Sequence, residues 1–262
     1  AQEVTTSNYD TAINTYKATG KRLLFKKGQT FSATAPAVLN VDGPGIVGAW
    51  GSGAIPKFTI PAANVGIYLS NQSTPTIKDW RVMDIEMDGQ DTTASGVGGD
   101  GGIDQALLLR LNIHNVDNGV VMSHSILDYH NNNGHPGHLM WDQFAMVDCR
   151  VNTIHGGVPA AGYVGAYVSA NRYTFMGNDM DSANGGGHVT RTPYIGRGVV
   201  SNNYYANSKA DKHLWQMHAP GQSDTGVAGG GLYTEKVVAS DNSFALGDAV
   251  WGVFVGPQAT AY

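Results

Sequence analysis

The segment VVSNNYYA at residues 199–206 indicates the fold, because related segments occur five more times along the chain. In most copies, a central residue that is Asn, Asp, Cys or aliphatic is flanked on both sides by a polar and then an apolar residue. The other copies are VMDIEMDG (82–89), LRLNIHNV (109–116), AMVDCRVN (145–152), TFMGNDMD (174–181) and VVASDNSF (237–244). We place the six centres at Ile85, Leu111, Cys149, Asn178, Asn202 and Asp241, which recur at unequal intervals along the chain. Such periodic self-similarity is typical of a solenoid.

The repeated unit consists of short strands rather than helices. Short apolar runs between Gly and Asn favour strands, and neighbouring coils of strands must bury one another's inner faces. Inward Asn side chains at successive coils can hydrogen-bond from coil to coil. The sequence therefore predicts one all-β domain over residues 1–262, a parallel β-helix whose coils occupy residues 21–262.

The two ends of the chain carry different signals. Tyr9, Ile13 and Tyr16 have helical spacing and Gly20 follows them, so we expect one helix over residues 8–20. This helix should cover the open first coil, which begins with KRLLFKKGQTF (21–31) and has strand edges that would otherwise promote aggregation. The last residues, AVWGVFVGPQATAY (249–262), have the pattern of a coil that continues, which leaves open a truncated C-terminus.

Composition excludes several classes of protein. The 262 residues include 35 Gly and only 14% are charged, which argues against long helices, while 42% hydrophobic content argues against disorder. A net charge of −5 without a basic run argues against nucleic-acid binding, and no stretch is apolar enough for a membrane span. The single Cys149 excludes a disulfide framework, and the AQE start is typical of a mature N-terminus. We expect a secreted or periplasmic bacterial protein.

The segment GGGHVTRTPYIGRGVVSNNYYANSKADKHLWQMHAPG (185–221) resembles the pectin-lyase-like right-handed parallel β-helix superfamily. The nearest likeness is to polysaccharide lyases of the alginate lyase and chondroitinase B type. There, a His-x-x-Arg strand precedes an apolar-apolar-x-Asn-Asn strand and a Lys-initiated strand that ends at a Gly turn. The resemblance implies a right-handed β-helix that cleaves an acidic, uronate-containing polysaccharide by β-elimination. It implies no required cofactor, with Ca²⁺ as an optional ion.

Basic residues are scarce, and they gather between His188 and His218. If residues 212–218 form a strand, Lys212, Gln216 and His218 point outward. His188 and Arg191 lie at corresponding positions in the preceding coil, so side chains of both coils can contact one sugar. The resemblance implies Lys212 as the base and Arg191 as the charge neutraliser or acid. The predicted catalytic residues are Lys212, Arg191, His188 and His218, and the predicted substrate-binding residues are Arg197, Gln216, His130, His135, His138 and Trp141. The alternative interpretation is that these outward Lys, Arg and His residues are ordinary solvated side chains of the surface.

Three further motifs leave alternatives open. HNNNGHPGH (130–138) matches no zinc spacing and favours a polar loop that lines a sugar groove. GGDGGID (98–104) resembles one Ca²⁺-binding turn, with Asp100 and Asp104 as the candidate ligands. NDMD (178–181) offers Asp179 and Asp181 as the carboxylate pair of a glycoside hydrolase. A hydrolase on the same scaffold and a non-catalytic glycan-binding or surface module therefore remain alternatives to the lyase.

Overall fold

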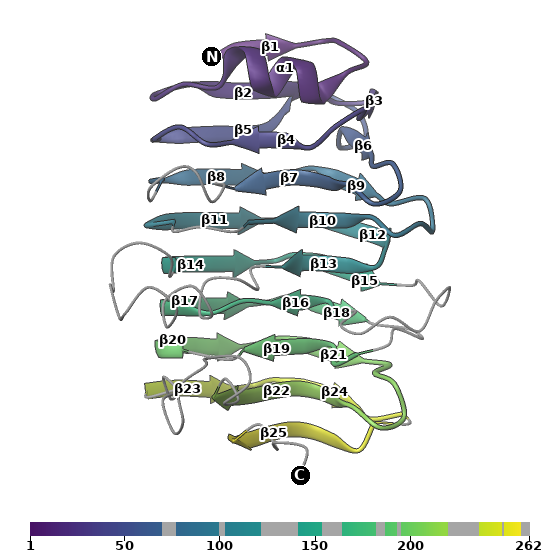
Figure 1. Cartoon of the computed structure of the whole chain (residues 1–262), viewed down its shortest axis with the longest axis vertical. Coiled ribbons are helices and arrows are strands. Elements are labelled where there is room, and N and C mark those ends of the chain that lie inside the picture. The colour runs from purple at the N-terminus through teal and green to yellow at the C-terminus, as the bar shows by residue number, and fades with distance from the viewer. Residues whose placement is uncertain are drawn as a thin grey trace.

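The chain forms a right-handed parallel β-helix with one short helix at its N-terminal end (Figure 1). The computed structural model describes residues 1–69, 77–99, 103–121, 141–153, 164–181, 187–192, 195–219, 236–247 and 249–257. Within these ranges, three sheets run along the stack and every pair of neighbouring strands is parallel. The described chain thus has the predicted fold class.

Each coil passes through the three sheets in turn. The first sheet contains, in spatial order, β1 (Gln2–Val4), β2 (Arg22–Lys26), β5 (Gly45–Trp50), β8 (Trp80–Met83), β11 (Gln105–Leu109), β14 (Trp141–Val147), β17 (Ala170–Met176), β20 (Ile195–Ser201) and β23 (Lys236–Ser240). The second contains β3 (Thr30–Ser32), β6 (Lys57–Thr59), β9 (Glu86–Asp88), β12 (Asn112–Val116), β15 (Arg150–Thr153), β18 (Asp179–Asp181), β21 (Tyr204–Ala206) and β24 (Ser243–Ala245). The third contains β4 (Ala37–Leu39), β7 (Val65–Leu69), β10 (Ser95–Gly98), β13 (Asn118–Val121), β16 (Ala166–Tyr167), β19 (Thr190–Thr192), β22 (His213–Ala219) and β25 (Trp251–Pro257).

The repeated sequence segments mark a corner of the coil rather than the middle of a strand. Each segment covers the end of a first-sheet strand, the corner, and the start of a second-sheet strand. At every one of these corners a residue has the left-handed conformation, with φ between 49° and 67°. These residues are Asp84, Arg110, Asp148, Gly177, Asn202 and Asp241. Two of the predicted inward centres, Asn202 and Asp241, are therefore wrong by one residue, because they occupy this left-handed position.

The inward position that follows holds a ladder of side chains. The Oδ1 atom of Asn203 accepts the backbone N–H of Asn178 at 2.9 Å and its Nδ2 donates to the Phe175 carbonyl at 2.9 Å. Asn242 bonds Asn203 in the same way. Cys149 completes the ladder with sulfur, because its Sγ accepts the Leu111 N–H at 3.4 Å and donates to the Leu108 carbonyl at 3.6 Å. The predicted coil-to-coil Asn bonding is confirmed with Asn178, Asn203 and Asn242.

The helix α1 (Tyr9–Tyr16) covers the first coil as expected, although it ends earlier than residue 20. Asn8 caps it by accepting the Thr11 N–H. The ring of Tyr9 stacks on Phe58 with centroids 4.1 Å apart, and its hydroxyl donates to the Gly66 carbonyl at 3.0 Å. The helix and β1 lie over β2 at the N-terminal end of the stack in Figure 1.

Candidate functional site

A groove of about 360 Å³ runs across the outer face of the first sheet. Arg81, Leu107, Ala145 and Thr174 lie in register on four successive strands, and the small side chains among them leave the surface hollow. The lining residues are Asp79, Arg81, Gln105, Ala106, Leu107, Gln143, Phe144, Ala145, Arg172 and Thr174. We call this hollow the first-sheet groove.

A second row of aligned residues borders the groove and becomes basic toward the C-terminal coils. Gln105 pairs with Gln143, Gln143 with Arg172, Arg172 with Arg197, and Arg197 with Lys236. We call Arg172, Arg197 and Lys236 the cation column. Strands of one sheet are about 4.8 Å apart, so three like charges are stacked at close spacing. Like charges at this spacing repel one another, and an anion bound between them would relieve the repulsion.

The three members of the cation column differ in their partners. Arg172 forms an ion pair with Asp142. Arg197 and Lys236 are exposed, and neither has a carboxylate within ion-pair distance among the residues that the structure describes. The column therefore carries net positive charge at its C-terminal end, next to the groove. Arg197 was predicted as a substrate-binding residue, and it lies in this column.

The structure separates the two principal predicted catalytic residues. Arg191 in β19 pairs with Gln216 in β22, and its guanidinium lies 5.2 Å from the centroid of the Tyr167 ring. Lys212 lies four residues before Gln216, at the corner between the second and third sheets, with its Nζ 3.0 Å from Asp211. Four residues of strand span about 13 Å. Arg191 and Gln216 therefore lie together on the third sheet, and Lys212 lies away from both.

His188 lies beside the start of β22 and has a defined tautomer. Its Nδ1 accepts the backbone N–H of His213 at 2.9 Å, so the neutral ring carries its proton on Nε2. The rings of His188 and His213 lie 5.0 Å apart, and His213 stacks on Phe254 at 4.8 Å. Burial, and then the charge of Lys212, lower the pKa of His213. His188, His213 and Phe254 therefore form one row of aromatic rings on the third sheet.

Several predicted residues fall outside what the structure describes. His130, His135, His138 and Asp100 lie outside the described residues, and of Trp141 and His218 only the backbone in β14 and β22 is described. Asp104 is half-buried before β11, where its backbone N–H donates to the Ile77 carbonyl. Among the described residues, no group of three His, Cys, Asp or Glu side chains could hold a metal ion. The described helix is also too short to cross a membrane.

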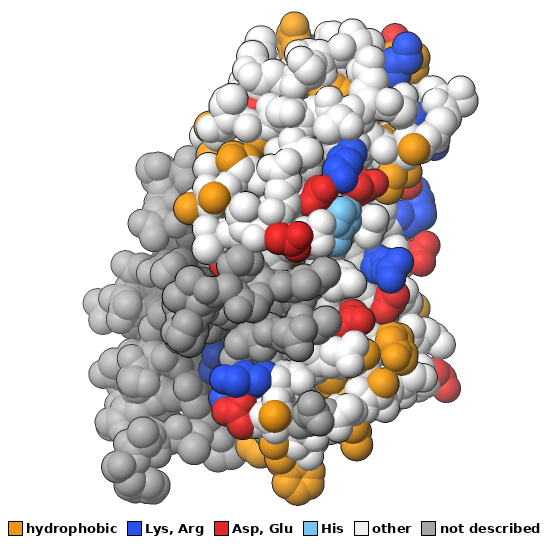
Figure 2. Space-filling view, turned by 90° about the vertical axis from the view of Figure 1, so that its right-hand side faces the viewer, with side chains coloured by type: hydrophobic (Ala, Val, Ile, Leu, Met, Phe, Trp, Pro, Cys, Tyr) orange, Lys and Arg blue, Asp and Glu red, His pale blue; other side chains and the backbone are white. Residues whose placement is uncertain are grey.

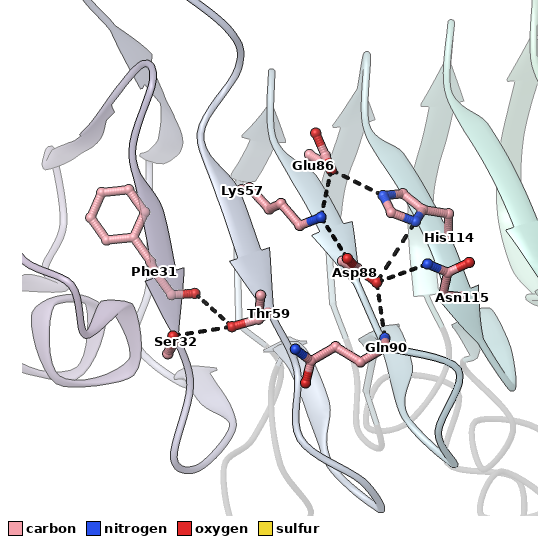
Figure 3. Close-up of polar contacts among 9 residues, drawn as sticks. All are labelled: Phe31, Ser32, Lys57, Thr59, Glu86, Asp88, Gln90, His114 and Asn115. Atoms are coloured by element: carbon pink, nitrogen blue, oxygen red, sulfur yellow. Dashed lines mark hydrogen bonds and ion pairs between the residues drawn. The ribbon is translucent and has the colours of Figure 1, made fainter.

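A charged cluster that the sequence analysis missed lies on the second sheet (Figures 2 and 3). Lys57, Glu86, Asp88 and His114 point outward from β6, β9 and β12, and we call them the second-sheet cluster. The Nζ of Lys57 lies 2.5 Å from Asp88 and 3.3 Å from Glu86. The Nε2 of His114 lies 3.1 Å from Glu86, and Asn115 donates to Asp88 at 3.0 Å. The cluster joins three successive coils.

The contacts within this cluster favour the ionised form of Asp88. Partial burial would raise the pKa of Asp88, but hydrogen bonds from Lys57, the Gln90 amide and Asn115, with the Lys57 charge, lower it to about 2. Hydrogen bonds to Asp88 and Glu86, together with the charges of these carboxylates, raise the pKa of Lys57 against the effect of its own burial. Glu86 and Asp88 both have basic partners on neighbouring strands, Lys57 on β6 and His114 on β12. We therefore assign the second-sheet cluster to the stability of the coil stack.

Asp179 and Asp181, the predicted alternative pair, lie further along the outer face of the same sheet. Asp179 lies 3.5 Å from Arg150, and Asp181 accepts a hydrogen bond from Asn207 at 2.9 Å. Both carboxylates therefore have partners of their own.

No protein-family model matches the chain, and comparisons with curated proteins and with solved structures also gave no match.

Proposed function

We propose that this protein is a carbohydrate-active protein that binds an acidic glycan along the first-sheet groove, and that it is a polysaccharide lyase. The cation column is the observation that carries this proposal. Arg172, Arg197 and Lys236 repeat at the spacing of strands, which is close to the length of one sugar unit in an extended glycan. A glycan with one carboxylate per sugar would match this repeat of positive charge.

The chemical groups of the groove suit a uronate chain. Arginine binds carboxylates through two parallel hydrogen bonds, which fixes the orientation of the sugar as well as its charge. Gln105 and Gln143 continue the same row, and their amides can donate to and accept from sugar hydroxyls. The apolar Leu107 and Ala145 beside them offer a floor for the C–H face of a sugar ring. Charged, hydrogen-bonding and apolar groups therefore lie side by side on one surface.

In β-elimination a base removes the proton at C5 of a uronate, the C4–O bond breaks, and a C4–C5 double bond forms. The electron pair of the broken bond goes to the leaving oxygen, which is then protonated. Neutralising the uronate carboxylate makes the C5 proton more acidic, and this is the step that the cation column can serve. Lys212 lies at the corner opposite the first sheet, so it remains the predicted base only for a sugar bound at that corner.

The test uses the intact chain with polygalacturonate, alginate and chondroitin sulfate. Elimination yields an unsaturated uronate that absorbs in the ultraviolet, whereas hydrolysis yields new reducing ends alone. The double variant Arg172→Ala/Arg197→Ala should weaken glycan binding about tenfold, whereas Arg150→Ala on the second sheet should not. Equal binding by all three proteins would overturn the groove assignment.

Two further outcomes identify the activity. Loss of ultraviolet product in Lys212→Ala, with glycan binding retained, would place the reacting sugar at the corner between the second and third sheets and would overturn the first-sheet groove as the site of elimination. Glycan binding by the unmodified chain without any product would identify a binding module and overturn the lyase.

A further inference from the structure

A second and smaller pocket lies at the first coil, next to the first-sheet groove. It has a volume of about 160 Å³, and we call it the first-coil pocket. Its lining residues are Gly20, Lys21, Arg22, Pro44, Gly45, Ile46 and Arg81. Arg81 also lines the first-sheet groove, so the two hollows share this side chain as a common wall.

The first-coil pocket has excess positive charge. Arg81 is neutralised, because its Nε and Nη2 atoms each lie 3.0 Å from a carboxylate oxygen of Asp79. Lys21 and Arg22 are exposed, and neither has a carboxylate within ion-pair distance in the described part of the chain. Two adjacent cations without a counter-charge attract an anion more strongly than a solitary surface lysine does.

The floor of the pocket is apolar and has the width of a sugar ring. Ile46 in β5 pairs with Arg22 on one side and with Arg81 on the other. The two arginine backbones are therefore two strand spacings apart, about 10 Å, with the half-buried Ile46 between them. A sugar ring that lies on Ile46 and Pro44 would place its anionic substituent within reach of Lys21 and Arg22.

We infer that the first-coil pocket binds an anionic sugar unit of the same glycan that occupies the first-sheet groove. This inference rests on the proposed function, and it adds the length and the binding mode of the substrate. Five strand steps separate Arg22 from Arg172 in the first sheet, a span of about 24 Å. A glycan that fills both sites must have about five or more sugar units, so the protein binds internal stretches of long chains.

The double variant Lys21→Ala/Arg22→Ala tests this inference by calorimetry with short and long oligogalacturonates, of about four and about ten units. Loss of two cations should weaken the binding of the long oligomer about tenfold and leave the short oligomer nearly unchanged. Arg150→Ala is the matched control, since it removes an exposed arginine from the second sheet. The single variant Arg22→Gln provides a milder change, and thermal unfolding checks that each variant is folded.

The outcomes separate this inference from the proposed function. Unchanged binding of the long oligomer by the double variant, with weakened binding in Arg172→Ala/Arg197→Ala, would refute the first-coil pocket alone. Failure of the unmodified chain to bind either length of oligogalacturonate or of sulfated heparin would refute both. Sulfated heparin oligosaccharides of the same lengths identify the anion. A length effect with galacturonate supports a carboxylate site, and a length effect restricted to heparin supports a sulfate site.

Discussion

Replacing Asn203 with alanine should destabilise the protein far more than the loss of one polar side chain at the surface. Asn203 is 2% exposed, and its carboxamide makes four hydrogen bonds. The substitution removes the acceptor of the buried Asn178 N–H and the donor to the Phe175 carbonyl. Each buried group left without a partner costs about 1–3 kcal/mol, so we expect a loss of about 3–4 kcal/mol.

Urea unfolding followed by circular dichroism measures this loss, with Asn112→Ala as the control. Asn112 is half-buried on the outer face of β12 and makes no side-chain hydrogen bond among the described residues, so its replacement should cost less than about 0.5 kcal/mol. The urea concentration at the midpoint of unfolding should fall in Asn203→Ala, while the slope of the unfolding free energy against urea concentration stays constant. A loss below about 1 kcal/mol in Asn203→Ala, or equal losses in the two variants, would refute the ladder as a source of stability.

Substitutions at three other positions have expected outcomes. The pKa of Asp88 is about 2 in the folded protein, against an ordinary value of about 3.9. The ionised carboxylate therefore stabilises the folded state above pH 4, and this stabilisation is lost as the pH falls toward 2. After allowance for solvent screening, the parent should lose about 1–2 kcal/mol more than Asp88→Asn between pH 5 and pH 2, and equal losses in urea titrations would contradict this. Cys149→Asn should stay within about 1 kcal/mol of the parent because it keeps the ladder bonds, whereas Cys149→Val should lose about 1–3 kcal/mol in urea unfolding. Arg110 has φ 49°, so Arg110→Asn should be within about 0.5 kcal/mol despite losing the Asp84 ion pair, and Arg110→Val should cost about 1–2 kcal/mol in the same assay.

Periodicity was sufficient to predict the coil stack but not the position of each side chain at the corner. The segments around Asn202 and Asp241 each contain two polar residues in succession, Asn202-Asn203 and Asp241-Asn242. Either residue suits an inward ladder, and Asn and Asp also tolerate the left-handed conformation. Only the backbone dihedral angles decide which residue turns the corner and which one points inward. The intervals between coils are therefore nearly correct, while the ladder is displaced by one residue in two coils.

The second-sheet cluster was missed for a different reason. Lys57 and Glu86 are distant in the sequence, and their contact arises only from the register between β6 and β9. A signal was present in the triplets KFT, EMD and NIH, at residues 57–59, 86–88 and 112–114. Each has an apolar centre between two polar residues, which is the pattern of a strand with one buried face. Aligning these triplets would have placed Glu86 beside Lys57 and Asp88 beside His114.

The unequal lengths of the coils have a practical consequence for protein engineering. Phe175 pairs with Val200, and Val200 pairs in the same register with Ala239, although the chain between the second pair is much the longer. The alignment of paired strands therefore does not depend on the number of residues that connect them. Foreign peptides grafted into the longer connections should leave the strand alignment intact. The solenoid can then serve as a display scaffold, and the grafted peptides can be exchanged without redesign of the interior.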